Sequence, residues 1–168
     1  MIRVLDILLR VIVIAIFAVL VCCVVWQVLS RYALGTPSTV TDEMARFLFM
    51  WLALIGGAYT LGQRRHLAID FLTGTLKGRA RTVSEAVILA IVALFAGLVL
   101  VWGGAMLTLR TLASGQVTPA LQIPMAWVYA AIPFAGLVML VYCAHFLIDL
   151  ARHGAQEQTD APVGGPLD

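Results

Sequence analysis

Four long runs without Asp, Glu, Lys or Arg divide this sequence. The first run lies between Arg10 and Arg31 and holds 20 residues. The hydrocarbon core of a bilayer is about 30 Å thick, and a helix that rises about 1.5 Å per residue crosses it in about 20 residues. Only 12% of the 168 residues are charged and 62% are hydrophobic, whereas about a quarter of the residues in a soluble domain are charged. The chain is therefore predicted to be an integral membrane protein and not a soluble globule.

The runs predict an all-α fold with four transmembrane helices. The second run has only 17 residues, so its helix is expected to begin earlier, around Thr41. The third run follows Thr82 and Glu85, which are spaced as in a capping box at a helix start. In the last run, Pro124 is expected near the first position of the helix and Pro133 is expected to kink it. The predicted spans are residues 11–30, 42–63, 86–109 and 124–148.

The distribution of cations predicts the orientation in the membrane. Four crossings place both termini on one side, and eight Lys or Arg residues would lie on that side against three on the other. Cytoplasmic loops carry the excess of Lys and Arg, so both termini are predicted to be cytoplasmic and the loops 31–46 and 110–123 external. The eight are Arg3, Arg10, Arg64, Arg65, Lys77, Arg79, Arg81 and Arg152, and the three are Arg31, Arg46 and Arg110.

The segment between the second and third spans is too polar to cross a membrane. Its leucines and Phe71 recur at nearly helical spacing beside five cations, which is typical of an amphipathic segment on the membrane surface. We expect residues 1–150 to form one domain and residues 151–168, which are rich in Gly, Pro and Gln, to form a disordered cytoplasmic tail. The candidate contacts to lipid headgroups in the interfacial segment are Arg64, Arg65, Lys77, Arg79 and Arg81.

The predicted spans contain almost no ionisable side chains. A transporter that works alone usually carries such groups at membrane depth, where they bind an ion, a proton or a charged substrate. His145 is the one candidate besides the thiols, and it lies near the inner end of the last span. No catalytic residue, metal site or cofactor is predicted from this pattern, and the chain is not expected to be an enzyme.

Three other classes of membrane protein remain open at this point. A four-helix haem-binding electron-transfer subunit would use His66 and His145 as axial ligands. A small multidrug exporter would need a membrane-embedded carboxylate, and Glu43 lies only at the membrane boundary. A structural membrane protein without a transport partner is the third. The spans also contain pairs of small residues spaced for close helix packing, namely Ala53 and Gly57, Ala58 and Gly62, Ala93 and Gly97, Ala126 and Ala130, and Ala131 and Ala135.

Three charged residues gather at the start of the second span. Asp42, Glu43 and Arg46 are spaced so that one helical face can hold them all. One interpretation is a helix start with Thr39 or Thr41 as the N-cap and two acids in the first turn. The helix dipole disfavours a cation there, however, so a specific ion-pair partner would explain Arg46 better.

Two stretches of the sequence resemble a known family. The first runs from Thr41 through Trp51 and continues with Gly56, Gly57 and Ala58, and then with His66 and Asp70. It resembles the signature of the small membrane subunit of tripartite ATP-independent periplasmic (TRAP) transporters, although Thr41 and Asp42 replace the Trp and Ser expected before the glutamate. The second stretch is similar to the pattern around that family's last external loop and fourth helix, and it consists of Pro119, Ala120, Leu121, Ile123, Pro124, Trp127, Tyr129, Pro133 and Gly136.

The resemblance implies a function that composition and spacing do not name. In such systems a periplasmic binding protein captures an organic acid, and a large membrane subunit carries it across the bacterial inner membrane with sodium. The small subunit is a non-catalytic scaffold that binds the large one, and which acid is carried cannot be read from it. Expected partners are the large subunit, the binding protein and membrane phospholipid, but no nucleic acid. The family-motif residues and candidate subunit contacts are Glu43, Arg46, Trp51, His66, Asp70, Pro119, Pro124, Trp127, Tyr129 and Pro133.

Overall fold

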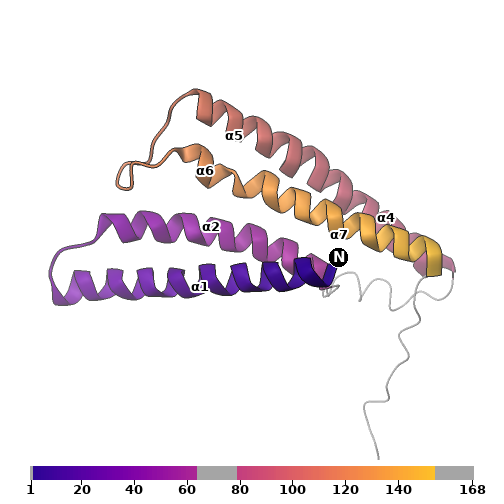
Figure 1. Cartoon of the computed structure of the whole chain (residues 1–168), viewed down its shortest axis with the longest axis horizontal. Helices are drawn as coiled ribbons and strands as arrows, with labels where there is room; N and C mark the ends of the chain where they lie inside the picture. The colour runs from indigo at the N-terminus through magenta and orange to yellow at the C-terminus, as the bar shows by residue number, and fades with distance from the viewer. Residues whose placement is uncertain (1, 64–78, 154–168) are drawn as a thin grey trace, which may run out of the picture.

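The computed structural model describes residues 2–63 and 79–153 (Figure 1). Within these ranges the chain is helical apart from its connections and one isolated antiparallel bridge. Four helical stretches are long and apolar enough to cross a membrane: Ile2–Ala33, Thr39–Gly62, Thr82–Ala113 and Met125–Arg152. The predicted all-α fold with four transmembrane helices is confirmed. The elements are α1 (Ile2–Ala33), α2 (Thr39–Gly62), α4 (Arg79–Phe95), the π-helix η1 (Ala96–Gly103), α5 (Gly104–Ala113), α6 (Met125–Tyr129) and α7 (Ala131–His153).

The helices extend beyond the charge-free runs that predicted them. α1 begins at Ile2 and therefore includes Arg3, Asp6 and Arg10, because the backbone can keep its helical hydrogen bonds where the side chains reach water. α4 is already helical at Arg79. Thr82 thus lies inside a helix, and the predicted capping box at the start of the third span is wrong.

The domain limits at residues 1–150 and 151–168 stay a prediction. α7 continues to His153, which lies beyond the predicted end of the domain. The predicted interfacial segment falls largely on residues 64–78 and most of the predicted tail on residues 154–168, and both ranges lie outside the described residues.

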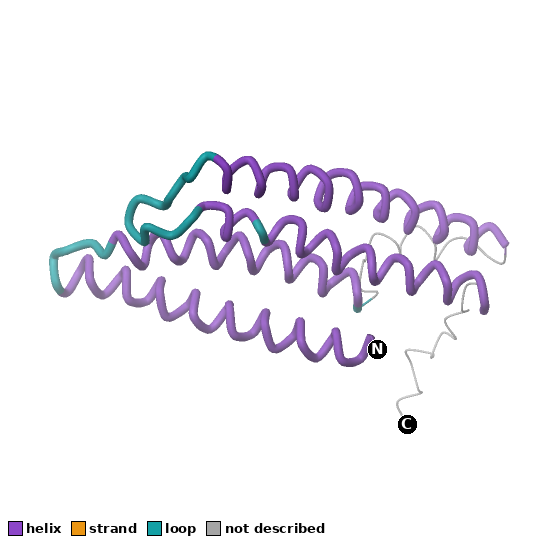
Figure 2. Tube along the Cα trace, turned by 45° about the horizontal axis from the view of Figure 1, so that its top comes forward, coloured by secondary structure: helices purple, strands orange, loops and turns teal. Residues whose placement is uncertain are grey.

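The four spans lie side by side in an open row (Figures 1 and 2). α1 packs against α2, α2 packs against α7, and α7 packs against α4 and η1. The third span, formed by α4, η1 and α5, and the first span, α1, are therefore the two edges of the row. The connections 34–38 and 114–124 lie at one end, called the loop end below, whereas Ile2 and His153 lie towards the opposite end, called the terminal end.

The last span is the most enclosed of the four. In the most apolar 18-residue stretch of this span, 39% of the residues are buried within the chain. The corresponding stretches of Ile2–Ala33 and Thr82–Ala113 have 11% and 6% of their residues buried. Many apolar side chains of both edge helices therefore face outwards and leave an apolar surface on each edge of the row. Exposed examples on the edges are Ile7, Val11, Ile14, Ile91, Leu94 and Leu98.

Glycines allow α7 to approach its neighbours closely. A Cβ atom on Gly136 of α7 would lie 2.7 Å from Cβ of Leu100 in η1 and 3.1 Å from the backbone nitrogen of Val101. A Cβ atom on Gly104 would lie 2.7 Å from Cγ2 of Ile132. Small residues let membrane helices pack through their backbones, so these positions set the spacing between the last and third spans.

The last span is interrupted near Pro133, as predicted. α6 ends at Tyr129 and α7 begins at Ala131, with Ala130 between them. A proline lacks the amide hydrogen for a helical bond, and its ring clashes with the carbonyl group four residues earlier, which here belongs to Tyr129. Pro124 is the N-cap of α6. It therefore lies one position before the first helical residue, near which it was expected.

A buried cluster joins α1, α2 and α7 towards the terminal end. Tyr142 of α7 is completely buried, and its ring stacks on Phe146 with the ring centroids 6.1 Å apart. The Tyr142 hydroxyl group donates a hydrogen bond to Oδ1 of Asp6 in α1. The last span is thereby linked to the far edge of the row. The other buried members of the cluster are Leu9, Ile55, Ala58, Ala135 and Val138.

We predict that Gly62→Ala destabilises the protein. The new Cβ atom would lie 2.6 Å from Cε1 of the buried Tyr142 ring, and moving that ring disturbs its hydrogen bond to Asp6. We expect a loss of about 1–3 kcal/mol, typical of overpacking, measured as a lower thermal midpoint in detergent. Gly56→Ala is the control, because nothing lies within 4 Å of its Cβ position. Equal midpoints for the two variants would contradict the packing described here.

Candidate functional site

The two family-like stretches meet at the loop end. The start of α2 carries the first stretch, and the connection 114–124 with α6 carries the second. Glu43 of α2 connects them: its Oε2 atom accepts hydrogen bonds from the backbone N–H groups of Ala120 and Leu121, both 2.8 Å long. One carboxylate oxygen of Glu43 thus binds two residues that follow it in the sequence by 77 and 78 positions.

The geometry explains why a carboxylate suits this position. Successive backbone N–H groups in a turn form a concave nest that binds an anion. Hydrogen bonds to a charged acceptor are roughly twice as strong as neutral ones. Pro119 precedes the two donors, and because it has no amide hydrogen the nest begins at Ala120. Glu43 therefore fastens the connection between the third and last spans to the start of the second.

The connection also holds its own shape. The Thr118 side chain is completely buried, and its Oγ1 atom accepts a hydrogen bond from the Ile123 N–H group at 3.2 Å. The Thr118 N–H group donates to the Ile123 carbonyl oxygen at 2.9 Å. Gln122 lies in the left-handed region with φ of 56°, and its side chain donates to the Pro119 carbonyl oxygen. The chain reverses tightly here, which presents the Ala120 and Leu121 amides to Glu43.

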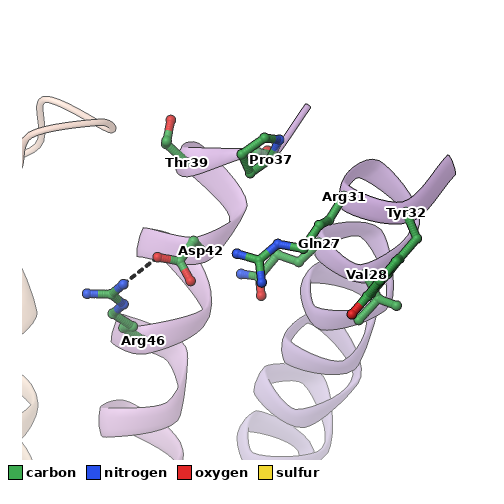
Figure 3. A pocket seen from close by; sticks show the side chains of 9 residues that line it. Gln27, Val28, Arg31, Tyr32, Pro37, Thr39, Asp42 and Arg46 are labelled. Atoms are coloured by element: carbon green, nitrogen blue, oxygen red, sulfur yellow. Dashed lines mark hydrogen bonds and ion pairs between the residues drawn. The ribbon is translucent and has the colours of Figure 1, made fainter. Parts of the chain in front are cut away.

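Asp42 and Arg46 form a separate pair on the exposed side of α2. Arg46 Nη2 donates to Asp42 Oδ2 across one helical turn, as Figure 3 shows. Both side chains are at least half exposed, so the pair contributes little to stability. Arg46 thus bonds to Asp42, whereas Glu43 accepts hydrogen bonds from the Ala120 and Leu121 amides. Ser38 is the N-cap of α2 and makes no side-chain capping bond, so the expectation of Thr39 or Thr41 as N-cap is wrong; the Thr41 hydroxyl group instead donates to the Ser38 carbonyl oxygen at 3.2 Å.

The other motif residues lie in different surroundings. Trp51 is partly buried against the cluster around Tyr142. Trp127 on α6 is 69% exposed, so its ring is available to lipid or to another protein. Tyr129 ends α6, and the Pro133 ring packs where Gly104 leaves room. His66 and Asp70 lie outside the described residues, as do Arg64, Arg65 and Lys77, whereas Arg79 and Arg81 lie in the first turn of α4.

Two features were missed by the sequence prediction. The bond between Asp6 and Tyr142 was not foreseen, because the predicted first span began at residue 11 and left Asp6 outside the membrane. η1 was not foreseen either, although π-helical turns often mark functional positions in helices. Gly97 and Gly103 lie within η1 and Gly104 directly follows it, but glycines alone do not predict a π-helix.

The contacts described at the loop end join elements of the chain to one another. Within residues 2–63 and 79–153, His, Cys, Asp and Glu side chains form no group of three that could hold a metal ion. The Glu43 carboxylate is occupied by two backbone amides. What the arrangement does is to fix the relative positions of the second, third and last spans.

Comparison with known sequences identifies the family. The sequence model described as the DctQ component of tripartite ATP-independent periplasmic transporters matches residues 20–153. The chain belongs to this family. The match includes Glu43, the connection 114–124 and all of the last span, so the contact between the two stretches lies inside the family region.

Individual relatives carry TRAP transporter names. The chain is 33% identical over 72 residues to the sialic acid TRAP transporter small permease protein SiaQ of Vibrio cholerae, covering 43% of this chain and 42% of the relative. It is 31% identical over 113 residues to the C4-dicarboxylate TRAP transporter small permease protein DctQ of Rhodobacter capsulatus, covering 67% and 49%. The chain thus spans less than half of these two small permease proteins.

A third relative is a much longer protein. The chain is 27% identical over 129 residues to the sialic acid TRAP transporter permease protein SiaT of Haemophilus influenzae, covering 76% of this chain but only 20% of the relative. A region similar to this chain is therefore one part of a larger permease polypeptide there. The chain described here is a multi-pass membrane protein of the TRAP small permease family.

We predict that Glu43→Ala loosens the connection 114–124. Without the carboxylate, the Ala120 and Leu121 amides lose a charged acceptor, which is worth about 1.5–3 kcal/mol per hydrogen bond. Hydrogen exchange should therefore become faster at these two amides, and the thermal midpoint should fall. Asp42→Ala is the matched control, because it removes a neighbouring carboxylate from an exposed ion pair worth about 1 kcal/mol or less. Unchanged exchange at Ala120 and Leu121 in the Glu43 variant would contradict the proposed fastening.

Proposed function

We propose that this chain is the non-catalytic small subunit of a TRAP transporter. In this role it binds a large membrane subunit and supports sodium-coupled uptake of an organic acid that a periplasmic binding protein delivers. The observation that carries the proposal is the open row of four spans in a member of the DctQ component family. A row exposes two apolar edges, and a frame for a larger membrane protein needs such surfaces.

The composition of the membrane core supports a passive role. The uncharged runs of the four spans hold no Asp, Glu, Lys or Arg, and groups that bind ions or charged substrates inside a membrane are usually of those types. His145 is exposed on α7 and lies edge-on to Phe146, with ring centroids 5.9 Å apart. The chain therefore supplies packing surfaces, while ion and substrate binding belong to the partner.

The longer relative supports the choice of partner. In SiaT, a region similar to this chain is part of a permease protein about five times as long as the matched stretch. Two regions that are joined in one polypeptide in one protein often associate when they occur as separate chains in another. We therefore assign the large TRAP subunit as the partner that covers one edge of the row.

The cation distribution supports an inner-membrane orientation with the terminal end in the cytoplasm. Residues 64–81 then lie at the cytoplasmic surface, where Arg and Lys side chains attract anionic phospholipid with about 1 kcal/mol each. The loop end lies in the periplasm, and the binding protein touches it transiently. The relatives' names mention sialic acid and C4-dicarboxylates, both of which are organic acids, and this supports an organic acid as the substrate class.

Co-expression and reconstitution test this function. We expect the chain to co-purify with the large subunit of a TRAP transporter from the same organism when the two are co-expressed. Liposomes with both subunits, supplied with the binding protein and a sodium gradient, should then take up the organic acid. Liposomes that contain this chain alone should show no uptake. Co-purification failure, or uptake by the chain alone, would contradict the proposal.

Arg46→Glu tests whether the exposed pair on α2 contributes to assembly. The substitution places a second acid beside Asp42 and removes the only motif cation on this face, so we expect weaker co-purification and slower uptake. Asp42→Asn is the matched control, because it removes the intrahelical partner and leaves the arginine. If both variants assemble and transport like the parent chain, Arg46 contributes only to the start of α2.

A further inference from the structure

The third span carries a continuous apolar surface on the side that faces away from the last span (Figure 1). Its exposed residues recur about every four positions through α4, η1 and α5, so they share one side of the helix. We call this surface the outer face of the third span. It consists of Leu94, Leu98, Val99, Trp102, Gly103 and Met106.

Gly103 lies in this face, and the packing of the chain itself does not require a glycine there. Its φ of −63° and ψ of −44° are helical values that any residue adopts. A Cβ atom on Gly103 would lie 3.7 Å from the Leu98 carbonyl oxygen of its own span, which is an ordinary contact distance, and near no atom of the other described spans. On Gly104 or Gly136, by contrast, it would lie 2.7 Å from an atom of the neighbouring span. Because glycine weakens a helix relative to alanine, Gly103 calls for another explanation.

A helix of another chain packed against this face explains the glycine. Small residues let membrane helices approach through their backbones, and flexible lipid tails have no such requirement. Trp102 lies beside Gly103 and is 69% exposed, and tryptophan is enriched among the residues that dominate binding between proteins. The other edge lacks this combination, because α1 contains no glycine and its exposed small residues include Ala15 and Ala18.

The extent of the family region also distinguishes the two edges. The DctQ component model matches residues 20–153, which include the whole third span but leave out residues 2–19 of α1. A surface that serves the members of a family is expected inside the region that they share. In SiaT, where a region similar to this chain belongs to a longer permease protein, the rest of that polypeptide can cover such a surface.

The charges favour the same edge. Arg3 and Arg10 are exposed on α1, where they can reach lipid headgroups at the end of the helix. An apolar partner that covered them would have to remove them from water, which costs free energy unless each gains an ion partner. The third span has no Asp, Glu, Lys or Arg from residue 86 to residue 109, so an apolar helix can cover it without burying a charge.

We propose that the large TRAP subunit docks on the outer face of the third span, with one of its apolar helices packed against Gly103. The α1 edge of the row then faces lipid. This assignment rests on the proposed function and names the edge that the partner covers. Trp102 packs beside the contact, and Leu98 and Met106 extend it towards the two ends of the span.

Site-specific photocrosslinking in the co-expressed complex tests the choice of edge. The photoreactive residue p-benzoylphenylalanine replaces Leu98 on the third span or Ile14 on α1, which are both 61% exposed. A further variant carries it at Val25, which lies on α1 inside the family region. We expect the Leu98 variant to form a covalent adduct with the tagged large subunit and the two α1 variants to form none. Adducts from Ile14 or Val25, or none from Leu98 in a complex that co-purifies, would overturn the assignment.

The same experiment separates this inference from the proposed function, because co-purification is measured before irradiation. A complex that forms and crosslinks through α1 refutes only the choice of edge. A chain that does not co-purify with the large subunit refutes the proposed function, and the docking face with it.

Gly103→Leu tests the close approach at the centre of the contact. We expect its affinity for the large subunit to fall about tenfold, as is typical of overpacking a close contact. The thermal midpoint of the isolated variant should stay unchanged, because the new side chain points away from the other described spans. Ala15→Leu is the matched control, because it adds a similar side chain to the exposed side of α1. Parent-like affinity in the Gly103 variant, or an equal loss in the Ala15 variant, would contradict the docking face.

Discussion

Close backbone packing around α7 is the constraint on which the rest of this structure depends. Lipid is as apolar as leucine, so helices in a membrane gain little from hiding apolar side chains from one another. Their association depends on contacts and hydrogen bonds that lipid cannot replace. Gly62, Gly104 and Gly136 provide such contacts on α2, α5 and α7, because a side chain at any of them would meet atoms of a neighbouring helix. The Tyr142 hydroxyl group adds a hydrogen bond to Asp6 on the first edge helix.

The row is fastened differently at its two ends. Towards the terminal end, the cluster around Tyr142 joins α1, α2 and α7 through buried side chains. At the loop end, Glu43 ties α2 to the connection between the third and last spans through two backbone amides. An open row without these fastenings would have edges that shift relative to each other. With them, the four spans present two broad apolar edges, which suits the proposed role as a frame for a larger membrane protein.

The number and type of the spans could be predicted from the sequence, because bilayer thickness fixes the length of an uncharged run. The break near Pro133 followed from the missing amide hydrogen of proline. The partner of Glu43 could not be predicted from spacing, because the bond joins positions in different spans and local patterns place only residues a few positions apart. The family resemblance highlighted both stretches without stating that they touch. Asp6 was missed because charge-free runs mark where side chains meet lipid and not where a helix begins.

The central claim is that these four spans form a frame that keeps its shape while a partner moves the substrate. Spin labels at Leu34 and Leu112, which are exposed at the loop ends of the two edge spans, report the width of the row in a background without the native cysteines. Double electron–electron resonance then measures the distance between the two spin labels in the reconstituted complex, with and without sodium, binding protein and organic acid. The account predicts one unchanged distance distribution under all of these conditions. A shift of several ångströms on addition of sodium and substrate would contradict it.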